Sequence, residues 1–187
     1  AGSPLLRVSQ AGLFPPDAKD GTSAFRTVCQ FSHMLPDDPI VAPGSPGASH
    51  LHVFWGNTST DASSTEASIA GTGNGTCRGG IGNRTAYWAP AVIDTRTGAP
   101  QAPRLIHVYY KSGYNGLAPG QMTMLPQGLR MIAGDYRASS WQGWNTVWKC
   151  SGTPAASHES IPDCPVGEDV EMMLMFPQCW DGVRLDS

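Results

Sequence analysis

The sequence predicts a mostly β fold: a single-domain antiparallel β-sandwich, jelly-roll-like, with long loops. Charged residues make up only 14% of the chain, well below the roughly 25% of an average soluble domain. Glycine (22 residues) and proline (16 residues) are both frequent. The apolar and β-branched segments are short, and most are bounded by Gly, Pro, Asn or Asp. This pattern is typical of many short strands joined by tight turns, whereas long surface helices carry many Lys and Glu.

The predicted elements follow one another along the whole chain. Strands are predicted over residues 25–31, 51–55, 87–93, 105–110, 129–133, 144–150 and 170–176. A Pro/Asp/Gly-rich segment over 36–47 predicts a long ordered turn. The polar residues 57–84 predict a long loop with one short helix near 65–70. The turn residues from Asp94 to Gly98 predict that the third and fourth of these strands form a hairpin.

One domain is the expectation for a chain of 187 residues. Residues 1–22 are rich in Pro and Gly and predict an irregular N-terminal arm, so the β-rich domain is placed over residues 23–187. No apolar stretch approaches the roughly 20 residues that span a bilayer, and no transmembrane segment is predicted. The net charge of −3 gives no basic surface for a nucleic-acid partner.

The cysteines indicate an oxidising compartment. They form no C-x-x-C pairs, which argues against a zinc knuckle or a thioredoxin motif. Cys150 and Cys164 bracket a Gly/Pro/Ser loop and form the first expected disulfide, and Cys29 with Cys77 forms the second. Structural disulfides persist outside the cytosol, so the chain is expected to be secreted.

A pair of histidines, His50 and His52, marks the most informative stretch for chemistry. Alternate residues of a strand point to the same face, so the two imidazoles are expected to project together while Leu51 faces the core. Two adjacent imidazoles can ligate a divalent transition metal, or act as base and electrophile. His33, which precedes the same turn, is a further candidate metal ligand. Ordinary structural or surface histidines remain the alternative.

Two carboxylates, Asp37 and Asp38, lie about a dozen residues upstream of the histidine pair. The Pro/Gly-rich turn between these carboxylates and the histidines can fold one carboxylate back against the imidazoles. There it would serve as a third metal ligand or orient a ring. Asp38 is therefore the third member of the candidate catalytic set.

Three further residues are candidates for binding substrate. If Ile106 and Val108 face the core, His107 and Tyr109 share the opposite face and can line a cleft, as the Tyr, His and basic groups of polysaccharide lyases do. Arg130 stands inside an apolar segment and can bind a carboxylate or sulfate. The alternatives are a solvent-facing strand for the first two residues and an ion pair with an acid such as Asp135 for Arg130.

The chain resembles a secreted bacterial and fungal family that is labelled a domain of unknown function. The resemblance lies in a D-P-I-V-x-P-G…G-A-S-H-L-H signature and in the segments 31–33, 37–41, 43–44, 47–52, 54–58, 87–91, 128–135 and 176–182. Fungal relatives are often joined to WSC modules and bacterial ones to carbohydrate-binding modules. The resemblance to proteins joined to such modules implies that the family acts on polysaccharide or on the cell wall.

The resemblance also implies that the natural chain continues past Ser187 into a further His-rich stretch, so that the domain is truncated at its C-terminus. Cys179 has no expected partner, which agrees with a continuation. A free buried thiol is the alternative reading of this cysteine.

Together these observations favour an exported carbohydrate-active enzyme that cleaves a polysaccharide or cell-wall glycan, as a hydrolase or a lyase. The expected catalytic residues are His50, His52 and Asp38. The expected substrate-binding residues are Arg130, His107 and Tyr109. The alternative is a non-catalytic metal-binding or wall-binding protein, whose divalent transition metal would be held by His50, His52 and His33. A purely structural wall protein is the third possibility.

Overall fold

The structure, a computed structural model, describes residues 24–111, 125–153 and 156–186. The chain falls into two compact units, one up to Met124 and one from Leu125 onward. The predicted mostly β, antiparallel fold is confirmed. The predicted N-terminal arm over residues 1–22 lies outside the described residues. Across the described ranges, no helix is long and apolar enough to cross a membrane.

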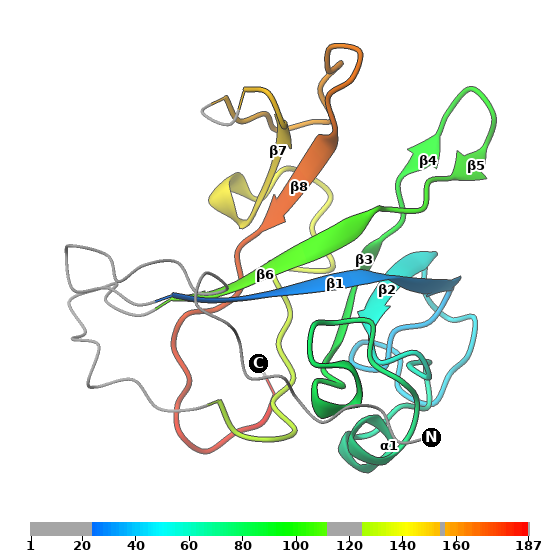
Figure 1. Cartoon of the computed structure of the whole chain (residues 1–187), viewed down its shortest axis with the longest axis vertical. Helices are drawn as coiled ribbons and strands as arrows, with labels where there is room; N and C mark the ends of the chain where they lie inside the picture. Colours follow the sequence, from blue (N-terminus) through cyan, green and yellow to red (C-terminus); the bar gives the residue numbers. More distant parts are fainter. Residues whose placement is uncertain (1–23, 112–124, 154–155, 187) are drawn as a thin grey trace. The chain divides into compact units, whose positions relative to one another are not determined.

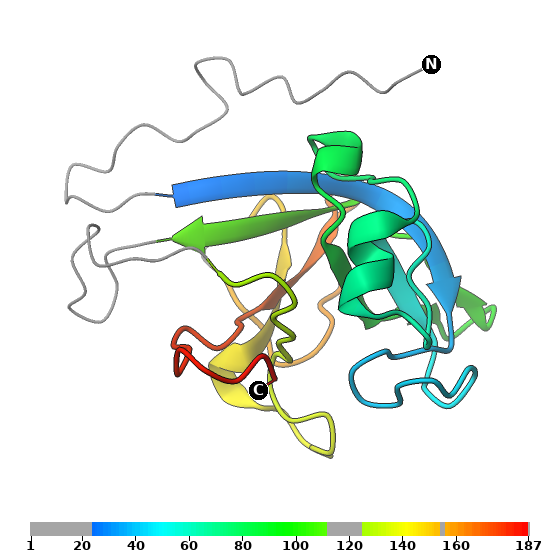
Figure 2. The ribbon, with the colours of Figure 1, turned by 90° about the horizontal axis from the view of Figure 1, so that it is seen from below.

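The first unit contains a four-stranded antiparallel sheet in the order β3-β2-β1-β6. Its strands are β1 (Ala24–Leu35), β2 (His52–Gly56), β3 (Ala86–Pro90) and β6 (Leu105–Lys111). The long strand β1 pairs with β6 along its first part and with β2 along its second part (Figure 1). The register shifts between Phe31 and His33, and β1 curves along its length (Figure 2).

The predicted hairpin between the third and fourth strands is wrong. Strands β3 and β6 form the two edges of the sheet and pair with β2 and β1 respectively. The turn from Asp94 to Gly98 instead closes a small hairpin of β4 (Ile93–Asp94) and β5 (Ala99–Pro100). The Gly98 N–H donates to the Asp94 carbonyl, and Gly98 has a positive φ of 70°. The turn chemistry was readable, but alternating apolar residues do not specify which strand is the partner.

Strand β2 is buried on both faces of the sheet. Cross-strand partners share a face, so the register assigns each side chain to one side. On one face the buried side chains include Cys29, Val53, Trp55 and Ala89. The opposite face carries His52 and Phe54, and the segment around Thr60 covers it, since the His33 ring on that face bonds the Thr60 carbonyl. A polar residue of β2 is thereby placed in the interior.

The predicted short helix is confirmed as α1 (Glu66–Gly71). Thr65 caps its N-terminus in a capping box with Ser68. The buried Asn57 side chain donates hydrogen bonds to the carbonyls of Ile69 and Thr72 and so ties the end of the helix to the end of β2. Because these carbonyls have no partner within a helix that ends here, the amide satisfies them.

In the second unit, β7 (Thr146–Cys150) pairs antiparallel with β8 (Val170–Leu174). The 3-10 helix η3 (Gly143–Asn145) leads into β7. The predicted strands 144–150 and 170–176 correspond to this pair. The predicted strand over 129–133 is not formed: Arg130 makes only an isolated bridge to Asp186. Gly128 and Gly134 flank this segment, and both have a positive φ, which glycine adopts readily at turns.

Both predicted disulfides, Cys29–Cys77 and Cys150–Cys164, are confirmed. Cys179 is a free cysteine and is exposed, so the reading of it as a buried thiol is wrong. The Cys29–Cys77 bond is buried and fastens residues 76–78 along the edge of β1, where the Gln30 N–H donates to the Thr76 carbonyl.

Removing the Cys29–Cys77 bond is expected to destabilise the protein more than removing Cys150–Cys164. The sequence separations are 48 and 14 residues, for which loop-closure entropy gives about 4 and about 3 kcal/mol. Paired Cys→Ala variants compared by denaturant unfolding test this order. Equal losses in the two variants would show that loop closure does not dominate.

Candidate functional site

The carboxylate of Asp38 organises the start of the turn that precedes the histidine pair. Its Oδ1 accepts hydrogen bonds from the backbone N–H groups of Ile40 and Val41, at 2.8 and 2.9 Å. Its Oδ2 accepts a bond from the Trp88 indole at 3.2 Å. An Asp can offer its own chain such bonds because its side chain is short. The result is a buried carboxylate whose position is set by both the turn and β3.

The neighbouring carboxylate, Asp37, joins two segments that lie far apart in the sequence. Its Oδ1 accepts from the Gly47 N–H at 2.8 Å, and its Oδ2 accepts from the Ala62 N–H at 3.0 Å. The residue is only 6% exposed. Its main-chain carbonyl accepts a third bond at 2.9 Å, from Nδ1 of His52. Asp37 therefore fixes both the turn and the buried imidazole.

The ring of His52 has a defined tautomer. A carbonyl only accepts hydrogen bonds, so Nδ1 carries the proton and Nε2 holds the lone pair of the neutral ring. Nε2 lies 3.9 Å from Oδ2 of Asp38, which is too long for a hydrogen bond. The two groups are nevertheless close enough for electrostatic interaction.

Burial lowers the pKa of His52, which is 4% exposed, below its ordinary value, and the nearby positive charge of His50 lowers it further. The Asp37 carbonyl and the Asp38 carboxylate oppose this shift but do not reverse it. His52 is therefore a neutral imidazole at neutral pH.

The second imidazole, His50, is exposed and lies just before β2. Its ring centroid is 4.3 Å from that of His52, with the two planes inclined at 45°. The expected pair is thus brought together, but one ring faces solvent and the other is interior. His52 is the most buried of the three residues, at 4% exposed against 7% for Asp38, and His50 is exposed. Leu51 between them is half-buried.

His33 is committed to other contacts. Its Nε2 donates to the Thr60 carbonyl and its Nδ1 accepts from the Ser32 hydroxyl, both at 2.8 Å. The ring also stacks on Phe54 at 4.8 Å. With both nitrogens engaged, His33 has no lone pair for a metal, and the described residues contain no group of three or more His, Cys, Asp or Glu that could hold one. The three-histidine metal site is therefore not formed.

His107 and Tyr109 lie on β6, beside Val28 and Arg26 of β1. Both are exposed while Ile106 and Val108 are half-buried, so the predicted alternation of this strand is confirmed. His107 lines a hollow of about 400 Å³ on the face of the sheet. Whether the two residues bind substrate stays a prediction.

Arg130 belongs to the second unit and pairs with Asp186 through Nε at 2.9 Å and through Nη2. The alternative of an ion pair with an acid is confirmed, with Asp186 in place of Asp135, whose carboxylate accepts from the Arg137 N–H. Arg130 is also exposed rather than enclosed in an apolar strand. Its role as an anion clamp stays a prediction.

Sequence reasoning missed the Trp88 indole that holds Asp38 and the main-chain carbonyl that holds His52. Neither has a local signal, because each is a contact between distant segments. The Asp-Asp pair before a Pro/Gly turn was the readable clue, since such carboxylates commonly accept nearby N–H groups.

Replacing Asp37 with Asn is expected to destabilise the protein by about 2 kcal/mol. The Asn side chain has an NH₂ group in place of one carboxylate oxygen, so it cannot accept from both N–H donors in this buried site. Denaturant unfolding measures the loss. The same change at Asp61, an exposed acid in the following loop, is the matched control and should have little effect. A loss no larger than that of the control would contradict the role given to Asp37.

The pH dependence of stability should carry the signature of His52. Its pKa is lowered from 6.5 in the folded chain, so its contribution is fully present above that value and declines as the pH falls below it. His52→Asn removes the titration while Asn Nδ2 can still donate to the Asp37 carbonyl. Unfolding free energies measured from about pH 7 down to about pH 5 should therefore fall less steeply in the variant. An unchanged slope would refute this.

Comparison with known families places the site in context. Residues 38–187, which include Asp38, His50 and His52, match the family described as Domain of unknown function (DUF1996). No curated protein and no solved structure matches the chain.

Proposed function

The chain belongs to the DUF1996 family of domains of unknown function, and from that premise we propose that it is an exported enzyme that cleaves a polysaccharide by proton transfer at the histidine pair. The observation that carries this proposal is the contact between exposed His50 and buried, neutral His52, at 4.3 Å between ring centroids. The substrate class rests on the resemblance to proteins joined to wall- and carbohydrate-binding modules.

In this proposal His50 is the group that meets the substrate, because it is the exposed member of the pair. In a hydrolase it would take a proton from water, whose oxygen bonds to the anomeric carbon as the glycosidic C–O bond breaks. In a lyase it would take the proton from the sugar carbon next to a carboxylate, and a C=C bond forms as the C–O bond of the neighbouring carbon breaks. In both cases the proton ends on the leaving oxygen. His52 acts behind it. A positive charge on His50 disfavours one on His52, so a proton taken up by His50 leaves the buried ring neutral.

Asp38 serves as a positioning residue in this scheme. Its Oδ2 is 3.9 Å from Nε2 of His52, and its carboxylate is held by three N–H donors. A fixed negative charge there stabilises a proton that moves onto the pair during reaction. Because the carboxylate cannot rotate freely, this charge costs no reorganisation at that moment.

Export is supported by the two disulfides, since such bonds form and persist in oxidising compartments. Cys29–Cys77 is buried and joins β1 to the segment along its edge, and Cys150–Cys164 joins the end of β7 to a loop. Bonds in such positions are structural rather than transient.

The adjacency of two imidazoles also favours a second candidate, a non-catalytic protein that binds a divalent transition metal or wall glycan. Nε2 of His52 and a ring nitrogen of His50 are two nitrogen ligands of the type that copper and zinc accept. Substrate oxygens or water would complete such a site.

The first test is product release from a panel of neutral and uronic polysaccharides. His50→Ala and His52→Asn are each expected to reduce cleavage by roughly 10²- to 10⁴-fold, the usual contribution of general acid–base catalysis. His158→Ala, which removes an exposed histidine of the second unit, is the control and should cleave normally. Reducing ends without unsaturation identify a hydrolase, and unsaturated products identify a lyase.

Full cleavage by both histidine variants would overturn the catalytic assignment. If the wild-type chain releases no product, titration of the chelator-treated protein with copper and zinc decides for the second candidate. Metal binding that is lost in His50→Ala would support it, and equal binding in that variant would exclude it.

A further inference from the structure

A second polar site lies on β1, where residues 76–78 and β6 flank the strand. Cys29 and Cys77 form an antiparallel bridge, and the Arg78 N–H donates to the Val28 carbonyl. On the other side, Val28 is the register partner of His107. Since cross-strand partners share a face, Arg78, Val28 and His107 form one row across the sheet.

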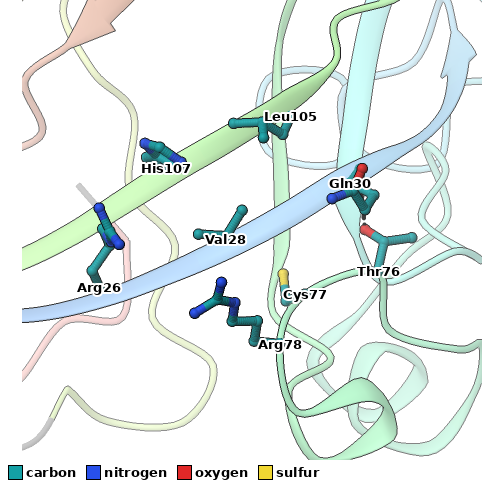
Figure 3. Close-up of a pocket in the computed structure, with 8 residues that line it drawn as sticks. All are labelled: Arg26, Val28, Gln30, Thr76, Cys77, Arg78, Leu105 and His107. Carbon is teal, nitrogen blue, oxygen red and sulfur yellow. Dashed lines mark hydrogen bonds between the residues drawn. The ribbon is translucent and has the colours of Figure 1, made fainter. Parts of the chain in front are cut away.

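The neighbouring rows complete a hollow on this face. One row joins Arg26 to Tyr109, and the other joins Thr76, Gln30 and Leu105. The hollow measures about 400 Å³, which is within the range of about 300–1,000 Å³ that small-ligand sites occupy. In Figure 3, Arg26, Arg78 and His107 surround the Val28 side chain.

The floor of this hollow is apolar and fixed. Val28 and Leu105 are half-buried, and Cys77 beside them is held by its disulfide. Thr76 is structural, because its hydroxyl donates to the Gln30 carbonyl and accepts from the Gly56 N–H. The apolar floor therefore rests on backbone that does not need a ligand to order it.

The walls carry the positive charges of Arg26 and Arg78. No salt bridge of the described residues involves Arg26 or Arg78. Arg26 is oriented instead by Tyr109, with Nη1 3.4 Å from the phenol oxygen and the guanidinium carbon 5.9 Å from the ring centroid. Among the described lining residues there is no Asp or Glu, although the whole chain is acidic with a net charge of −3.

We propose that this hollow binds an acidic saccharide, with the carboxylate or sulfate group of the sugar between the guanidinium groups of Arg26 and Arg78. Arginine recognises both oxyanions through its planar fork of N–H donors. The apolar face of the sugar ring lies on Val28 and Leu105, and the exposed amide of Gln30 stands at the rim for hydroxyl groups. The choice of a saccharide rests on the proposed function, but the site is separate from the histidine pair and can bind whether or not that pair is catalytic.

Three sugars that share one ring test the proposal: galacturonate, galactose 6-sulfate and galactose. Each is titrated into the full chain while NMR follows the backbone amide signals of Val28, Arg78 and His107. We expect at least one of the acidic sugars to shift these signals and galactose to leave them unchanged. A response to galacturonate alone assigns a uronate site, and a response to the sulfate alone assigns a site for sulfated sugars.

The double variant Arg26→Gln/Arg78→Gln is expected to bind the acidic sugar about tenfold or more weakly, as loss of charge-assisted hydrogen bonds implies. The matched control is Arg96→Gln/Arg137→Gln, which removes the same charge outside the hollow and should bind as wild type does. His50→Ala should also bind normally.

If the double variant does not fold, Arg78→Gln alone replaces it, because that side chain is exposed and forms no hydrogen bond or ion pair within the described residues. The proposal is overturned if neither acidic sugar shifts the three signals, if galactose binds equally well, or if the arginine variants bind like their control.

Discussion

The hydrogen bonds of Asp37 are the constraint on which the histidine site depends. The turn between β1 and β2 and the loop that follows β2 form no strand ladder with each other, so their main-chain N–H groups need other partners. The Asp37 carboxylate accepts from Gly47 in the turn and from Ala62 in the loop, and the Asp37 carbonyl accepts a hydrogen bond from Nδ1 of His52. A buried carboxylate is tolerable only when such donors replace its water. The interaction that stabilises the turn therefore also selects the tautomer of the imidazole.

The length of β1 gives the sheet two separate polar places on one face. Its first part pairs with β6 and its second with β2, and the register shift next to Ser32 keeps both sets of side chains on consistent sides. Val28 and Leu35 mark the two places, roughly 20 Å apart along the strand. At the first of these places the face is open, and the arginines reach solvent. At the second, the segment around Thr60 contacts His33, and the turn at Asp37 contacts the buried ring of His52. One strand thus presents an open and a covered polar environment.

Local features such as caps and turns could be predicted from the sequence, whereas the pairing of distant segments could not. The short helix after Thr65, the turn at Asp94–Gly98 and both disulfides followed from capping, turn residues and cysteine spacing. The hairpin between β3 and β6 failed because alternation defines a strand's faces but not its neighbour. At the site, the adjacency of His50 and His52 followed from their spacing, but the burial of only one of them depends on contacts with chain that is distant in sequence, such as the Asp37 carbonyl. His33 looked equivalent in sequence, but its ring is bonded to the Thr60 carbonyl.

The unequal environments of the two histidines distinguish this pair from two surface residues that happen to be adjacent. A solvated pair would share one ordinary environment, and neither ring would be held in one tautomer. Here burial keeps His52 uncharged, its Nδ1–H group donates to a main-chain carbonyl, and the lone pair at Nε2 lies on the side of a fixed carboxylate. His50 has access to solvent and contacts that ring. The lone pair of that neutral ring is at Nε2, on the side of the fixed Asp38 charge, and His50 is the member of the pair that solvent reaches. This division between a solvent-accessible imidazole and a buried neutral one supports the proton-transfer role proposed for the pair.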